Sequence, residues 1–180
     1  MKSKLKMSIK GWLFAVIFFV FAVYAGFIQY HYDGIKDIDV TFLFTNLGDY
    51  IWSLISLIII VILYVAFSLV PSRKLTLLPN IFMLMTAGQI LVQAYYTLPR
   101  LNIIGLVVEL IFTITHLMLA YYLTKISFDV IDNDNDKKGY FNNWFNQLKK
   151  SLMQNYRELT IFMILYILIR SITVISVTIK

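Results

Sequence analysis

The chain has 180 residues, of which 59% are hydrophobic and only 14% are charged, and its mean hydropathy is +0.75. So few charged side chains cannot cover a water-exposed globule, which excludes an ordinary soluble domain. The formal net charge of +6 does not indicate nucleic-acid binding, because the basic residues lie at the ends of apolar runs and not on one solvated face.

Apolar runs of membrane-spanning length recur along the chain. An α-helix that rises 1.5 Å per residue needs about 20 apolar residues to cross the roughly 30 Å hydrocarbon core. Five runs reach this length, at residues 11–30, 50–70, 76–96, 101–123 and 159–178. The sequence therefore predicts an all-α integral membrane protein of the cell or inner membrane, with a five-span transmembrane helix bundle forming one domain over residues 1–180.

The lysines and arginines between the runs predict the orientation, since these residues are enriched on the cytoplasmic side. One side receives twelve lysines and arginines, namely Lys2, Lys4, Lys6, Lys10, Arg73, Lys74, Lys125, Lys137, Lys138, Lys149, Lys150 and Arg157. The opposite side receives only Lys36, Arg100 and Lys180. We expect the N-terminus to be cytoplasmic and the C-terminus external.

Residues 140–156, between the fourth and fifth spans, form a predicted amphipathic helix. Its apolar face carries Phe141, Trp144, Phe145, Leu148 and Leu152 at helical spacing. Asparagines and lysines occupy the opposite face, and this arrangement is typical of a helix in the headgroup region of a bilayer. We expect a cytoplasmic interfacial helix, which either anchors the chain passively or presents these five residues to a protein partner.

Polar side chains inside the predicted spans are the candidate site. Glu109 and His116 lie in the fourth span, Arg170 in the fifth, and Gln89 and Gln93 in the third. Counting inward at 1.5 Å per residue places Glu109, Arg170 and Gln89 about 12–13 Å from the external ends of their spans. A charge within the membrane needs a partner there. Because Glu109 is the only acid in the predicted spans, we expect a Glu109–Arg170 pair bridged by Gln89.

The sequence leaves the role of this layer open. The pair could fix helix register, the layer could line an outward-facing pocket for a small polar or anionic solute, or the residues could pair with another subunit. His116 is two turns from Glu109 on nearly the same face. A neutral imidazole hydrogen-bonded across helices is favoured over a catalytic or proton-relay role.

Nothing in the sequence predicts catalysis. A zinc site needs three or four ligands, and the chain has two histidines and no cysteine. No nucleophile has a candidate base beside it. We therefore expect no catalytic residue, no metal and no cofactor. The favoured function is a non-catalytic membrane subunit or partner-binding protein of the assembly, regulatory or immunity type. The alternative is a small-solute-binding or transport protein with a pocket around Glu109, Arg170 and Gln89.

Overall fold

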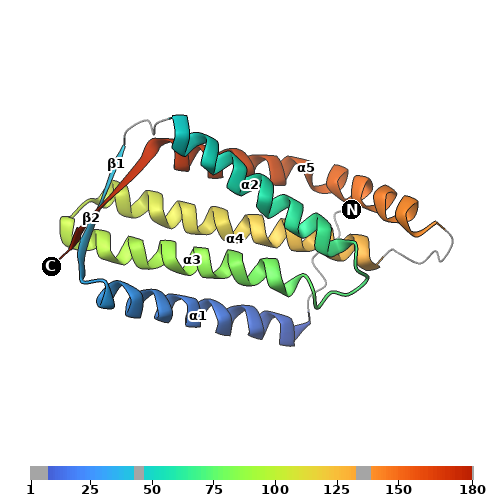
Figure 1. The fold of residues 1–180 in the computed structure, drawn as a ribbon, viewed down its shortest axis with the longest axis horizontal. Helices are drawn as coiled ribbons and strands as arrows, with labels where there is room; N and C mark the ends of the chain where they lie inside the picture. The colour runs from blue at the N-terminus through green and yellow to red at the C-terminus, as the bar shows by residue number, and fades with distance from the viewer. Residues whose placement is uncertain (1–7, 43–46, 133–138, 180) are drawn as a thin grey trace.

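The computed structural model describes residues 8–42, 47–132 and 139–179. These residues form an elongated, mostly helical bundle with strands at one end (Figure 1). The elements, in chain order, are α1 (Ile9–Tyr32), β1 (Ile35–Phe42), α2 (Leu47–Ser68), α3 (Leu77–Thr97), the 3-10 helix η1 (Leu98–Arg100), α4 (Ile103–Asp132), α5 (Tyr140–Ile172) and β2 (Thr173–Ile179). We call the end with β1, β2 and η1 the strand end. The opposite end, which carries Lys10, Arg73, Lys74, Lys149 and Lys150, is the lysine-rich end.

Among the described residues, α1, α2, α3 and α4 are long and apolar enough to cross a membrane. This confirms that the first four predicted runs form long apolar helices that could cross a membrane, with their boundaries moved by a few residues. The exception is α4, which continues to Asp132, nine residues beyond the predicted end at 123. It continues because its buried face runs on through Ile126, Phe128 and Val130.

The predicted interfacial helix at 140–156 and the fifth span at 159–178 are corrected by the structure. They form one helix, α5, of 33 residues that ends at Ile172, and residues Thr173–Ile179 form β2. The polar segment around residues 154–158 does not break the helix, since Gln, Arg and Glu are good helix formers. The last residues of the predicted span leave the helix because a β-branched run favours a strand when a partner strand is available.

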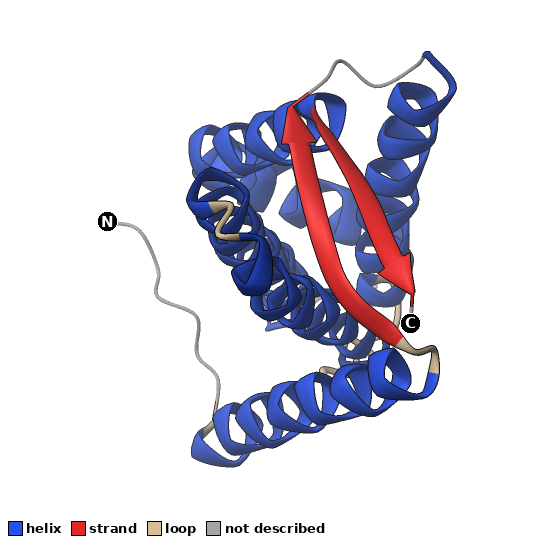
Figure 2. Cartoon of the chain, turned by 90° about the vertical axis from the view of Figure 1, so that its left-hand side faces the viewer, coloured by secondary structure: helices blue, strands red, loops and turns tan. Residues whose placement is uncertain are grey.

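β1 supplies that partner strand. It pairs antiparallel with β2, and Ile38 lies opposite Val177. The two strands cross the strand end of the bundle (Figure 2). Ile38 and Val40 are fully buried there. Asn102 fastens β1 to the start of α4, because its Nδ2 donates to the Val40 carbonyl at 2.7 Å while its Oδ1 accepts from the Gly105 amide at 2.9 Å.

Each helix packs against particular neighbours. α1 packs on α3, α3 on α4 and α4 on α5, while α2 lies against α4 and α5. The α1–α3 contact uses small residues, since a Cβ added at Gly88 would stand 2.9 Å from the Ala22 Cβ and one added at Gly26 would stand 3.1 Å from the Val92 Cγ2. Small residues at this spacing let two helix backbones approach closely within a membrane. Ala22 and Gly26 therefore contact α3 of the same chain.

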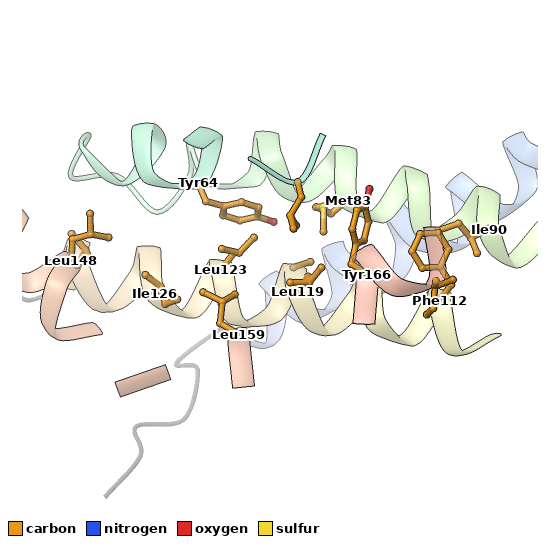
Figure 3. Packing of buried hydrophobic residues seen from close by; sticks show 14 of the residues in the cluster. Tyr64, Met83, Ile90, Phe112, Leu119, Leu123, Ile126, Leu148, Leu159 and Tyr166 are labelled. Carbon is orange, nitrogen blue, oxygen red and sulfur yellow. The ribbon is translucent and has the colours of Figure 1, made fainter. Parts of the chain in front are cut away.

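The main apolar core lies between α2, α3, α4 and α5 (Figure 3). It extends along almost the whole bundle, from Leu148 near the lysine-rich end to Phe112 and Ile169 near the strand end. α5 contributes Trp144, Leu148, Leu159, Tyr166 and Ile169. The helix is therefore attached to the bundle over its full length, including the part predicted to lie separately on the membrane surface.

Candidate functional site

The first polar group lies between the halves of α4 and α5 that are nearer the strand end. Glu109, Phe112 and His116 follow one face of α4 at i, i+3 and i+7, and Tyr166 and Arg170 follow the facing side of α5 at i and i+4. The His116 and Tyr166 ring centroids are 5.6 Å apart, and the Phe112 and Tyr166 centroids are 5.4 Å apart. The sequence-predicted residues Glu109, His116 and Arg170 therefore lie in one neighbourhood, which we call the α4–α5 polar cluster.

Two members of this cluster carry buried polar atoms that have no hydrogen-bond partner. Glu109 is 3% exposed and His116 is 1% exposed. Within the described part of the chain, Glu109 Oε2 and both ring nitrogens of His116 have no hydrogen-bond partner. Buried polar atoms in proteins almost always have a partner, which can be a water, an ion or a bound molecule. The unpartnered carboxylate oxygen of Glu109 and the ring nitrogens of His116 could therefore form hydrogen bonds with a polar ligand.

Arg170 does not complete the cluster in the predicted way. The guanidinium of this exposed residue lies over the Phe112 ring at 5.8 Å, a cation–π arrangement, and among the described residues it forms no ion pair with Glu109. Its charge still acts electrostatically on Glu109, His116 and Tyr166. Arg170 lies in the last turn of α5, and there its side chain contacts the Phe112 ring and is hydrogen-bonded to the Tyr166 side chain instead of pairing with Glu109.

The two predicted glutamines of α3 differ in their surroundings. Gln89 is exposed on α3, so the predicted bridge between Glu109 and Arg170 is wrong. Gln93 is half-buried, and its side chain is hydrogen-bonded to the Tyr30 side chain of α1. The predicted depths were similar, but depth does not determine which face of a helix turns inward.

A second polar group, which the sequence analysis missed, lies between α4 and α5 nearer the lysine-rich end. Lys125 is only 5% exposed, and its Nζ donates to Asn155 Oδ1 at 2.7 Å. Asn155 Nδ2 donates to the Ser151 carbonyl at 2.8 Å, and Ser151 Oγ donates to Asp129 Oδ2 at 3.3 Å. The signal was present in the sequence, since Ser151 and Asn155 continue the helical face of Trp144 and Leu148.

The five predicted docking residues separate into two groups. Trp144 and Leu148 are buried in the core of the chain itself, and Trp144 Nε1 donates to Ser68 Oγ at 3.2 Å. Leu152 is half-buried against the same core. Phe141 and Phe145 are 64% and 56% exposed. Only these two phenylalanines remain available to a partner.

A polar clamp joins the strands to the bundle at the strand end. Arg100 Nε donates to Asp37 Oδ1 at 2.6 Å, and Arg100 Nη2 donates to Thr178 Oγ1 at 2.7 Å, so one arginine holds both strands. The hydrogen bond from Arg100 lowers the pKa of the Asp37 carboxyl below its usual value of 3.8. The strand pair is therefore attached through charge as well as through Ile38 and Val40.

Comparison with known proteins gives no family for this chain. No family model, no curated protein and no solved structure matches it. Among the described residues, no three His, Cys, Asp or Glu side chains gather in a way that could hold a metal ion. The functional argument therefore depends on the geometry of the chain.

Proposed function

We propose that the chain is a non-catalytic, multi-pass subunit of a larger membrane complex and that it binds a protein partner at its lysine-rich end. The excess of lysine and arginine at that end supports a cytoplasmic location for it, which would leave the strand end outside. α5 returns beside α4 from the lysine-rich end to the strand end, so it would act as a fifth crossing sheltered by its neighbours (Figure 1).

One observation carries this proposal, namely the exposure of Phe141 and Phe145 on the first turns of α5. At 1.5 Å per residue, a 33-residue helix is about 50 Å long, whereas the hydrocarbon core is about 30 Å thick. Several turns of α5 therefore extend beyond the bilayer. Burial of Trp144 and Leu148 fixes these turns against the bundle, which favours a protein over the membrane surface as the neighbour of the two phenylalanines.

The chemistry of the expected partner follows from the residues around the two phenylalanines. Lys149 and Lys150 are exposed on the following turns of the same helix. Aromatic anchors carry much of the binding energy at protein interfaces, and surrounding charges set specificity and the rate of encounter. The partner is expected to present an apolar groove bordered by acidic residues.

Copurification from native membranes in mild detergent tests the proposal. The wild-type chain is expected to retain one partner in fixed stoichiometry, measured by native mass spectrometry, and the double variant Phe141→Ala/Phe145→Ala to lose it at least tenfold. Met153→Ala is the matched control, because Met153 is equally exposed on another face of α5 and should retain the partner. Retention of the same partner by the double variant, or a wild-type chain that is always monomeric, would contradict the proposal.

The α4–α5 polar cluster favours a second candidate function, the binding of a small polar solute. The observation behind it is the set of buried, unpartnered atoms of Glu109 and His116. A solute that bound only the folded state would raise the melting temperature of the purified chain. A screen of small amino acids, carboxylates and ammonium compounds is expected to give a shift that Glu109→Gln abolishes. A screen without any shift removes this candidate.

A further inference from the structure

A cleft of about 370 Å³ lies between the first half of α1 and the facing turns of α3 and α4. Gly11, Ala15 and Phe19 line it from α1 at i, i+4 and i+8, and Leu84 and Leu117 line it from the opposite helices. This volume falls within the roughly 300–1,000 Å³ of ordinary ligand sites. The cleft lies toward the lysine-rich end of helices that are apolar enough to cross a membrane.

The packing of α1 explains why the space is open. α1 approaches α3 closely where Ala22 meets Gly88 and Gly26 meets Val92, in the half nearer the strand end. Toward its N-terminal end α1 lies apart from the other helices (Figure 2). Gly11 has no side chain and Ala15 has only a methyl group, so neither fills the space that the divergence leaves.

Two polar side chains in the wall of the cleft, Asn80 and Thr124, are already hydrogen-bonded within the chain. Asn80 Oδ1 accepts from the Tyr64 hydroxyl and from Thr124 Oγ1, each at 2.8 Å, and Asn80 Nδ2 donates to the Thr76 carbonyl at 2.8 Å. The remaining wall is almost entirely apolar. Water in such a space would lack the two to four polar partners that it requires. A hydrocarbon chain, which needs none, suits the cleft better.

We infer that this cleft holds one acyl chain of an anionic glycerophospholipid from the leaflet at the lysine-rich end. Exposed Lys10 directly precedes Gly11, and exposed Lys74 lies three residues before Leu77, so two cations stand at the ends of the helices that form the cleft. Basic residues at a membrane surface attract anionic headgroups. The tail would bind by its shape and the headgroup by its charge. This inference does not depend on the proposed function.

Photocrosslinking of the wild-type chain tests the inference without any substitution. The chain is placed in nanodiscs of phosphatidylcholine doped with phosphatidylglycerol whose acyl chain carries a diazirine, and the labelled residues are mapped by mass spectrometry. Label is expected to be enriched several-fold at Phe19, Leu84 and Leu117 over Ile62, an exposed apolar residue of α2. Equal labelling of these positions would overturn the inference, because the cleft would then contact lipid only as the rest of the surface does.

Two sets of variants distinguish the tail from the headgroup. Ala15→Phe should fill the cleft and reduce the phosphatidylglycerol retained after detergent purification several-fold, whereas Ala66→Phe, the same change on an exposed position of α2, should not. Lys10→Gln/Lys74→Gln should remove the preference for phosphatidylglycerol over phosphatidylcholine and keep the label at Phe19. Unchanged retention in Ala15→Phe would overturn the tail site, and an unchanged preference in the lysine variant would overturn the anionic headgroup.

Discussion

The least expected residue in this chain is Lys125. In the sequence it follows an apolar run and is counted among the cytoplasmic flanking residues, yet the structure buries it between α4 and α5. Its ammonium group is satisfied by Asn155, a neutral residue that belongs to the buried face of α5. A buried cation with a neutral acceptor costs free energy when that acceptor is lost, since the charge cannot be solvated in its place.

This arrangement predicts a non-additive pair of substitutions. Asn155→Leu is expected to lower the free energy of unfolding by about 2–3 kcal/mol, because it strands the Lys125 ammonium group. Lys125→Met in the same chain should restore part of that loss, since it removes the stranded charge. The measurement is thermal unfolding in mild detergent of both single variants and the double variant. Losses that simply add would show that Lys125 and Asn155 act independently.

The polar residues that the sequence did identify show which part of a site can be predicted. Counting residues along the spans placed Glu109 and Arg170 at similar depths, because helical rise is constant, and the i+7 spacing placed His116 on nearly the same face as Glu109. The structure has these three residues in one neighbourhood. The same count failed for Gln89, which faces away from the bundle. The direction of a side chain depends on how its helix is rotated, and in an apolar span the hydrophobic pattern does not reveal that rotation, since lipid and core are equally apolar.

At the scale of elements, the spans were predictable and the strands were not. An apolar run of membrane length leaves few alternatives to a helix, so the boundaries of α1, α2 and α3 were close to those predicted. Residues 173–178 of the predicted fifth span belong to the strand Thr173–Ile179, because they lie at the end of the bundle where β1 can pair with them. Only the partner strand distinguishes the two outcomes, and because β1 (Ile35–Phe42) is distant in the sequence, the local composition of residues 173–179 does not reveal it.

The close approach of α1 to α3 predicts the effect of enlarging Gly88. Leucine has the better helix propensity by about 0.8 kcal/mol, but a Cβ at this position would stand only 3.0 Å from the backbone nitrogen of Val23. We therefore expect Gly88→Leu to push α1 away and to lower the free energy of unfolding by about 1–3 kcal/mol. Thermal unfolding measures the loss, with Ala66→Leu on the exposed side of α2 as the control. Equal stability of Gly88→Leu and wild type would show that α1 is free to move outward.

The strand pair should respond to acid through Asp37. Because its pKa is lowered in the folded chain, the Asp37–Arg100 interaction contributes fully above pH 3.8, the usual carboxyl pKa, and is lost as the pH falls through the lowered value. Wild type should therefore be more stable than Asp37→Asn near neutral pH, and the difference should shrink as the pH falls below 3.8 through the lowered pKa of Asp37. Melting temperatures of both proteins across this range provide the measurement. A difference that does not change with pH would contradict the assignment to Asp37.

At the scale of the whole molecule, the two ends of the bundle differ in chemistry. The lysine-rich end is basic and aromatic, while the strand end is closed by an antiparallel strand pair and an Asp37–Arg100 clamp. This asymmetry gives a membrane protein a defined orientation, since basic segments stay on the cytoplasmic side. The proposed partner surface at Phe141 and Phe145 and the cleft beside α1 both lie toward the lysine-rich end.

The absence of cysteine in the sequence makes the orientation directly testable. Lys36→Cys in β1 is expected to react with a membrane-impermeant maleimide added to intact cells. Lys149→Cys in α5 should react only after the membrane is permeabilised, because we expect the two residues on opposite sides. Both side chains are exposed, so access within the protein is not limiting. Labelling of both positions from the same side would contradict the proposed topology.

The pairing of β1 with β2 also sets an order of assembly. β1 follows the first helix, whereas β2 follows the fifth, so a ribosome makes β1 long before its partner exists. Until then the edge of β1 that will pair with β2 presents unpaired backbone groups, which are prone to pair with another chain. A chain interrupted after α4 would hold four helices and still leave that edge open. The β1–β2 pair can therefore form only after all five helices have been synthesised.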